Sequence, residues 1–236
     1  MVRSGSGGGA KTRTTAKTIV AVEHAELSND PFPHWLLNEI IPPAVYNQIV
    51  SLPIAPADID SAAGKRSSYN DSRVFINPEL RKQHSVMDTV ARTFQDPKVV
   101  SAIEKKLGIN LEGSSLRIEY CQDKDGFQLE PHKDIPEKLM TMQIYLADDP
   151  KLGTDLYDKD QQFYSSVMAK KGTGMVFLPK TENSWHGFEK RPIDGIRRSL
   201  IVNYVTPEFR AKHELAFPDC PIVNSLAAGL GAAVEA

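Results

Sequence analysis

The feature that most constrains the fold is a set of three side chains that could bind one metal ion from distant places in the chain. His132 and Asp134 are spaced as His-x-Asp, so in an extended segment both side chains point to the same face. His186 comes much later in the sequence and can join them only if the fold lays a second strand beside the first. The chain must therefore bring distant strands together around a common centre.

Two imidazoles and one carboxylate form the facial triad of non-haem Fe(II) oxygenases, which leaves coordination positions open for other ligands. We therefore predict that His132, Asp134 and His186 are metal ligands and catalytic residues. The residues alone leave two other uses open. Three protein ligands plus a water also suit a hydrolytic zinc enzyme, and the same set would serve a metal-binding barrel without oxidation chemistry.

A second motif follows the last histidine. Arg197-x-Ser199 opens a segment rich in β-branched and aromatic residues, which predicts a strand. On one face of that strand, Arg197 and Ser199 would form a carboxylate receptor, because a guanidinium binds a carboxylate through two hydrogen bonds and stays charged. Arg198 points to the opposite face, and a shift by one residue would exchange the two arginines. Arg198 is therefore the alternative anchor.

Taken in order, these motifs resemble the Fe(II)- and 2-oxoglutarate-dependent dioxygenase superfamily, and more narrowly its bacterial prolyl-4-hydroxylase-like members. The likeness covers roughly residues 116–205 and is carried by segments 131–139, 152–157 and 177–187. The resemblance implies a double-stranded β-helix, a jelly-roll core of the cupin-like kind. It also implies Fe(II), the co-substrate 2-oxoglutarate, and O2 as the cofactors.

The resemblance assigns roles to individual residues. It implies that the triad holds Fe(II), that Arg197 and Ser199 hold the distal carboxylate of 2-oxoglutarate, and that Tyr120 lines the cofactor pocket. The expected enzyme is a dioxygenase that hydroxylates an unactivated C–H bond of a small molecule, releasing succinate and CO2. Asp134 fills the position that related halogenases leave empty for chloride, so we expect hydroxylation rather than halogenation.

The substrate is expected to be an amino acid or a natural-product intermediate, with a prolyl residue of a peptide as the alternative. Residues 53–77 are rich in Pro, Ala, Ser and Asp and predict a long loop, a kind of segment that often binds substrate. We expect Tyr69, Asn70 and Arg73 to contact the substrate. Trp185, next to the second histidine, is expected to wall the same pocket.

The length of 236 residues suits one catalytic domain, mainly β with flanking helices. We expect residues 18–220 to form this domain, with core motifs at 116–205, between a Gly- and Ser-rich flexible tail over 1–17 and a second flexible tail over 221–236. The sequence predicts a first strand over 18–22. It also predicts helices from Pro42 to about Leu52, after Asn77 to about Phe94, and from Asp96 to Gly108.

The composition limits which partners and which cellular compartment are expected. A net charge of −2 and a pI near 6.3 give no field that would gather nucleic acid. Two cysteines are too few for a disulfide framework, and no run reaches the ~20 apolar residues of a membrane helix. The start of the chain also lacks the apolar core of a secretory signal. We expect a cytoplasmic protein with a small-molecule partner and no binding to nucleic acid or membrane; the oligomeric state is left open.

Overall fold

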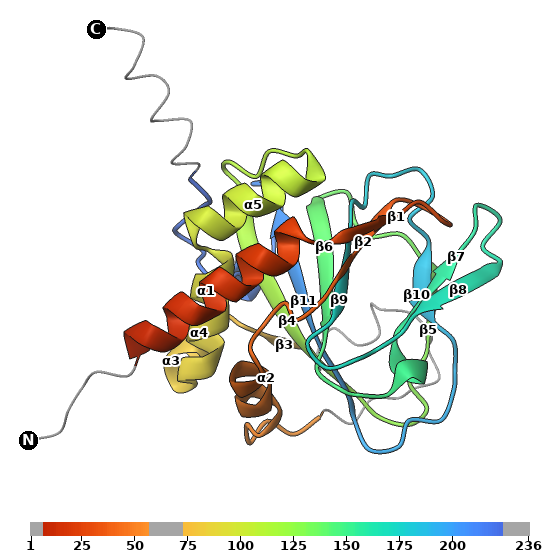
Figure 1. Cartoon of the computed structure of the whole chain (residues 1–236), viewed down its shortest axis with the longest axis horizontal. Helices are drawn as coiled ribbons and strands as arrows, with labels where there is room; N and C mark the ends of the chain where they lie inside the picture. Colours follow the sequence, from red (N-terminus) through yellow and green to blue (C-terminus); the bar gives the residue numbers. More distant parts are fainter. Residues whose placement is uncertain (1–6, 57–72, 224–236) are drawn as a thin grey trace, which may run out of the picture.

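Two facing β-sheets form the centre of the protein, as seen in a computed structural model that describes residues 7–56 and 73–223 (Figure 1). The larger sheet has the strand order β1-β2-β9-β6-β11-β4-β3, and the smaller has the order β5-β10-β7-β8. All pairings between these strands are antiparallel. In the larger sheet, in order, the strands are β1 (Glu26–Ser28), β2 (His34–Leu37), β9 (Gly174–Phe177), β6 (Lys138–Tyr145), β11 (Arg197–Val205), β4 (Ser115–Asp123) and β3 (Val74–Phe75). Those of the smaller sheet are β5 (Leu129–His132), β10 (His186–Phe188), β7 (Thr154–Tyr157) and β8 (Phe163–Val167).

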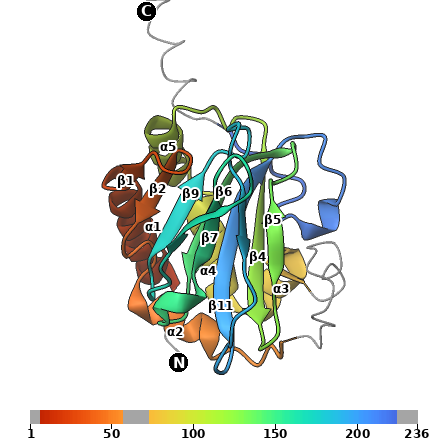
Figure 2. The same ribbon diagram turned by 90° about the vertical axis from the view of Figure 1, so that its right-hand side faces the viewer.

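Helices cover the face of the larger sheet that points away from the smaller sheet (Figure 1). Figure 2 shows the molecule turned by 90° from Figure 1, with the strands in front and the helices beside and behind them. The expected fold class, mainly β with flanking helices, is confirmed. The α-helices are α1 (Gly7–Glu23), α2 (Pro43–Val50), α3 (Pro78–Gln83), α4 (Ser85–Phe94) and α5 (Pro97–Leu107), and two short 3-10 helices are η3 (Pro150–Leu152) and η4 (Lys212–Glu214).

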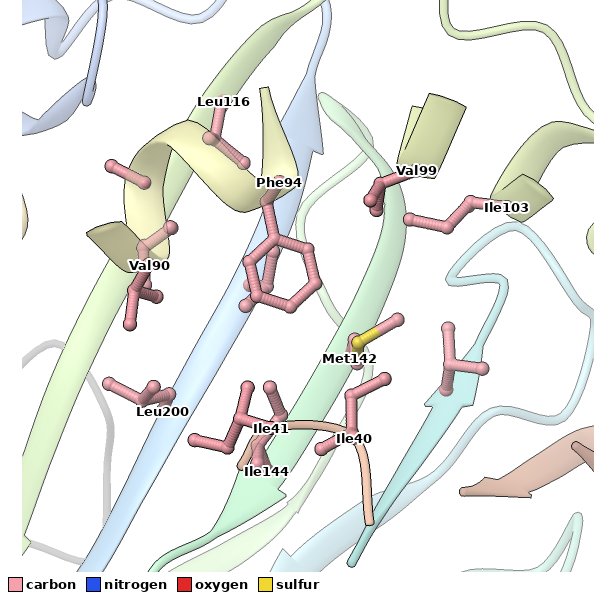
Figure 3. Close-up of a cluster of buried hydrophobic side chains, with 14 of the residues drawn as sticks. Ile40, Ile41, Val90, Phe94, Val99, Ile103, Leu116, Met142, Ile144 and Leu200 are labelled. Atoms are coloured by element: carbon pink, nitrogen blue, oxygen red, sulfur yellow. The ribbon is translucent and has the colours of Figure 1, made fainter. Parts of the chain in front are cut away.

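The apolar core lies between the helices and the larger sheet. Side chains alternate across a strand, so every second residue of β4, β6 and β11 faces the helices. Phe94, which is fully buried, reaches from α4 into the middle of this layer (Figure 3). The strand residues of the cluster are Leu116, Ile118, Tyr120, Met140, Met142, Ile144, Leu200, Val202 and Tyr204.

The other face of the same strands is polar although it is buried. It carries Arg117 and Glu119 on β4, Thr141 and Gln143 on β6, and Asn203 on β11. Buried polar groups cost free energy unless they are hydrogen-bonded. The polar face is therefore the first place to look for a site.

Two of the helices begin and end as their sequences predict. In α5, the Asp96 side chain accepts a hydrogen bond from the Lys98 N–H, and Gly108 ends the helix with a left-handed φ of 67°. Helix α2 likewise starts at Pro43. The predicted helix over 78–94 is divided in two, because His84 has an extended backbone (φ −131°, ψ 106°) between α3 and α4.

The beginning of the chain differs most from the prediction. Residues 7–23 form one helix, so the flexible tail over 1–17 and the strand over 18–22 are both wrong for the described residues. The β-branched run at 18–22 favours a strand locally. Packing on α4 and α5 overrides that preference, because it buries Thr14, Thr18 and Val22 on one side of the helix.

The end of the domain extends slightly beyond the predicted boundary at residue 220. Ile222 is buried, and its N–H donates to the Ser114 carbonyl oxygen at 2.7 Å. The predicted tail over 221–236 is therefore wrong for residues 221–223, because Ile222 packs in the core, and the rest of it lies outside the described residues. None of the helices within 7–56 and 73–223 has the length and apolar content needed to cross a bilayer.

Candidate active site

Three residues of the sequence motif meet at one point between the two sheets. His132 ends β5 and His186 begins β10, and the two are direct partners in the antiparallel pairing of these strands. Their ring centroids are 4.4 Å apart, and His186 Nε2 lies 4.0 Å from an Asp134 carboxylate oxygen. One potential ligand atom from each residue lies within 4.8 Å of the other two. The predicted triad is therefore assembled in space.

Strand pairing at this point depends on a glycine. A Cβ on Gly187 would lie 2.6 Å from the Leu129 carbonyl oxygen, so a side chain there would push β10 away from β5. Glycine at this position lets the strands that carry His186 and His132 approach each other.

Both histidines present the same ring nitrogen to the centre. Nδ1 of His132 is 3.0 Å from the Glu130 carbonyl oxygen, and Nδ1 of His186 is 3.0 Å from the Ser184 carbonyl oxygen. A carbonyl oxygen only accepts, so each Nδ1 carries the proton and each Nε2 keeps a lone pair for a metal. Such outer hydrogen bonds are the usual way in which a histidine ligand is oriented. The donor set, two neutral imidazoles and a carboxylate, fits a divalent iron ion.

The carboxylate of the triad is held by two donors from β6. Lys138 Nζ forms an ion pair with Asp134, and Thr141 Oγ1 donates to the other carboxylate oxygen at 2.6 Å. The side chains of Lys138 and Asp134 are only 5% and 4% exposed. These contacts fix the carboxylate beside the histidines.

A hydrogen-bonded chain continues from this carboxylate across the larger sheet. Asn203 Nδ2 donates to Thr141 Oγ1 at 2.9 Å, and its side-chain oxygen accepts from Arg117 Nη1 at 3.2 Å. Arg117 also pairs with Glu214 at 2.5 Å. The three residues Thr141, Asn203 and Arg117 are direct neighbours across β6, β11 and β4, so the strand register sets their positions.

Arg197 and Ser199 line the same cavity as Asp134 and His186. Arg197 Nε donates to the Leu152 carbonyl oxygen at 2.7 Å, Nη2 donates to Gly153 O at 3.0 Å, and Nη1 pairs with Asp123. A guanidinium has five N–H groups, so these three bonds leave two N–H groups that no hydrogen bond within the described residues accounts for. The fork is thus fixed in direction and can still bind a carboxylate, although Asp123 offsets part of its charge.

Polar groups beside Arg197 form a second hydrogen-bonded set. Thr154 Oγ1 donates to Gln143 Oε1 at 2.8 Å, so the Tyr145 hydroxyl, 2.7 Å away, must donate to Thr154. Gln143 Nε2 is 3.5 Å from Ser199 Oγ. Burial raises the pKa of Tyr145 to about 12, so its hydroxyl stays a neutral donor at ordinary pH.

The alternative anchor lies on the wrong side of the sheet. Arg198 is not among the cavity-lining residues and faces the helices with Tyr120, where its charge and hydrogen bond partly offset the rise that burial causes in the pKa of Tyr120. Tyr120 is counted among the lining residues, but its ring belongs to the apolar cluster. By strand alternation, Arg117 faces the triad and most of the Tyr120 ring faces the helices, so the role of Tyr120 at the cofactor stays a prediction.

The predicted substrate residues have different positions. Arg73 lines the cavity and pairs with Glu119 at 2.8 Å. Trp185 is half-buried and is not among the cavity-lining residues; Lys133 Nζ lies over its ring, 5.4 Å from the centroid. Tyr69 and Asn70 lie outside the described residues.

Several residues of the site were not expected from the sequence. Lys138, Thr141 and Asn203 hold or support Asp134, and Asp123 holds Arg197. One signal was available: Asn203 interrupts an otherwise apolar stretch of its strand, and an amide there must find partners when buried. The pair formed by Asp123 and Arg197 gave no such signal, because pairing between distant strands depends on the strand register.

The cavity has a volume of about 940 Å³ including its open mouth. It is walled by both sheets: β4, β6 and β11 contribute polar residues such as Glu119, Thr141 and Ser199, and β5 and β10 contribute Leu129 and Phe188.

Comparison with known proteins gives a fold assignment. No family model and no curated protein matches the sequence. A prolyl-4-hydroxylase from Pseudomonas putida superimposes with a TM-score of 0.50 and 16% identity, over 82% of this chain and 94% of that chain. A prolyl hydroxylase from Trichoplax adhaerens, in complex with a peptide fragment of hypoxia inducible factor, gives a TM-score of 0.55 and 12% identity over 83% and 90%. The two sheets therefore have the double-stranded β-helix fold of 2-oxoglutarate oxygenases, as the resemblance implied.

Proposed function

We propose that this protein is an Fe(II)- and 2-oxoglutarate-dependent dioxygenase that hydroxylates an unactivated C–H bond of a small molecule. One molecule each of substrate, 2-oxoglutarate and O2 would give the hydroxylated product, succinate and CO2. The single observation that carries the proposal is that Asp134 and His186, which form the triad with His132, line the same cavity as Arg197. A metal-binding barrel without oxidation chemistry would need the triad but has no use for a buried arginine directed into the same space.

Different residues would bind the metal, bind the co-substrate and exclude water. The two Nε2 atoms and the Asp134 carboxylate would hold the iron, and Arg197 with Ser199 would orient 2-oxoglutarate by its distal carboxylate. When bound, iron and 2-oxoglutarate together would supply the oxidising power drawn from O2. Phe177, which packs on His186 at 4.8 Å between ring centroids, and Phe188 would keep water from the reacting atoms.

The substrate is the part of the proposal with a second candidate. The two structural neighbours described above are prolyl hydroxylases, and one of them is in complex with a peptide, which favours a prolyl peptide as the alternative. We retain the small molecule because the site is a pocket between the two sheets whose described lining is mostly strand residues. We also retain the cytoplasm as the expected compartment.

An assay of succinate release tests the proposed reaction. The purified protein is loaded anaerobically with Fe(II), the metal content is measured, and 2-oxoglutarate is added with and without O2. We expect succinate only when Fe(II), 2-oxoglutarate and O2 are all present. Asp134→Ala should abolish the release, whereas Asp160→Ala, at an exposed aspartate paired with Lys159, should leave it unchanged.

Other metals distinguish the rival functions. Activity with zinc, or product formation without O2, would instead indicate the hydrolytic enzyme. Iron binding without any turnover of 2-oxoglutarate would favour the metal-binding barrel.

A further inference from the structure

Among the described residues, three ion pairs of a Lys or Arg with a carboxylate line the cavity, and two of them have a place in the proposed reaction. Lys138 pairs with the metal ligand Asp134, and Arg197 pairs with Asp123 beside the 2-oxoglutarate site. The third pair, Arg73 with Glu119, is used by neither the metal nor the co-substrate. Its function is therefore open.

This third pair is largely buried in the wall of the cavity. Arg73 Nε lies 2.8 Å from Glu119 Oε1, and the two side chains are 13% and 5% exposed. Removing two charges from water is costly, and a buried ion pair often stabilises a fold no better than apolar side chains would. Glu119 also lies 3.7 Å from Arg117, so the carboxylate is set in a cationic surrounding.

The position of the pair suits a substrate rather than the co-substrate. From Asp134 the hydrogen-bonded chain crosses β6, β11 and β4 through Thr141, Asn203 and Arg117. Glu119 is the next residue along β4 on the same face. Adjacent strands are ~4.8 Å apart, so the pair is roughly 10 Å from Thr141 across the sheet. Arg197, the proposed anchor of the co-substrate, lies in another direction from Thr141, toward the start of β11.

The charges of the cavity wall balance. Among the described lining residues, the cations are Arg73, Lys138 and Arg197, and the anions are Glu119, Asp123 and Asp134. Fe(II) carries two positive charges and 2-oxoglutarate two negative ones, so loading the site would not alter the total. A substrate with a net charge would then add a buried charge that no opposite charge compensates, and its desolvation would cost free energy.

We propose that Arg73 and Glu119 bind the two charged ends of a zwitterionic small molecule, of the class of free α-amino acids. The substrate ammonium would lie on Glu119 and the substrate carboxylate on Arg73. Each side chain would then exchange part of its contact with the other for an opposite charge on the ligand, so neither is left buried alone. This inference rests on the proposed function for the reaction, but the binding step can be measured without turnover.

Titration calorimetry with three sets of probes tests the binding. The sets are free L-amino acids, their N-acetyl derivatives, which lack the ammonium, and their carboxamides, which lack the carboxylate. Each is titrated into the protein in the presence of Fe(II) and 2-oxoglutarate under anaerobic conditions. We expect at least one free amino acid to bind, and each of its two blocked forms to bind at least tenfold more weakly.

Variants locate the binding at the ion pair. Glu119→Gln, which keeps the shape of the side chain, should weaken the free amino acid at least tenfold and leave the N-acetyl derivative unchanged. Arg92→Gln removes an arginine from an exposed ion pair with Asp88 on α4 and is the matched control, with no expected effect.

Several results would overturn the inference: no free amino acid binds, the blocked forms bind as tightly as the free ones, or neutral sugars or prolyl peptides bind while free amino acids do not. The comparison of blocked and free probes on the unmodified chain does not depend on the folding of any variant. The proposed function is judged separately, by O2-dependent succinate release, so the two can fail independently.

Discussion

The two faces of the larger sheet are built from the same strands and have opposite chemistry. On β11, Leu200, Val202 and Tyr204 face the helices, while Ser199 and Asn203 face the smaller sheet. The helix side is closed by apolar packing, which gives stability. The other side buries polar and charged groups in hydrogen-bonded sets that support the triad and the proposed 2-oxoglutarate anchor. Alternate residues of one strand thus contribute to stability on one face and to the site on the other. Substitutions on the helix side should therefore change the free energy of unfolding, and those on the cavity side should change ligand binding.

The largest effect is expected from a substitution that creates a cavity on the helix side of the larger sheet. Phe94→Ala removes a fully buried ring from the centre of the apolar layer, and such changes cost about 3–5 kcal/mol of unfolding free energy. Denaturant unfolding should show this loss. The activity per folded molecule should stay within about twofold of the unmodified chain. A loss of 2-oxoglutarate affinity in the folded fraction would mean that the two faces are coupled.

On the cavity side, the two adjacent arginines provide a matched test. Arg197→Gln combined with Asp123→Asn removes the buried pair as a unit, so no carboxylate is left uncompensated. Hydrogen bonds to charged groups contribute about 1.5–3 kcal/mol, so the KM for 2-oxoglutarate should rise by roughly 10- to 150-fold. Arg198→Gln, on the helix side, should leave this KM unchanged. Equal effects of the two changes would remove Arg197 from its proposed role.

A single hydroxyl tests whether the polar network serves the metal. Thr141→Val removes the donor to Asp134 and the acceptor for Asn203 with little change in shape. Loss of an outer hydrogen bond typically weakens metal binding by 10- to 100-fold, so the Fe(II) dissociation constant should rise in that range. Thr141→Ser keeps the hydroxyl and should restore most of the affinity. If serine is no better than valine, Thr141 acts only through packing.

The smallest effect is expected from the loss of one hydrogen bond on the helix side. The Tyr204 hydroxyl donates to the Phe94 carbonyl oxygen at 2.5 Å. Tyr204→Phe should cost about 1 kcal/mol of unfolding free energy, the usual net value of such a bond, and should change neither metal nor 2-oxoglutarate affinity. A change in either affinity would show that the helix side is not purely structural.

The sequence was sufficient to predict three central strands and to bring His132 and Asp134 together, because period-2 alternation and the His-x-Asp spacing are local properties. The three strands β4, β6 and β11 appear near the positions that alternation predicts. The helix over 7–23 was missed because its stability comes from packing on α4 and α5, which no local pattern contains.

The partners of the site residues were also beyond a local pattern. Asp123 and Arg197 are direct partners in the pairing of β4 with β11, and only the register of these strands brings them together. The same register decides that Arg117 and not Tyr120 faces the triad.

The central claim is that His132, Asp134 and His186 hold a ferrous ion in the same cavity that takes 2-oxoglutarate. Anaerobic titration of the iron-loaded protein with 2-oxoglutarate, followed by visible absorption, tests it directly. We predict a weak metal-to-ligand charge-transfer band that saturates at one 2-oxoglutarate per chain and is lost in Asp134→Ala. Absence of the band from unmodified protein with its iron site filled, or its persistence in Asp134→Ala, would contradict the account.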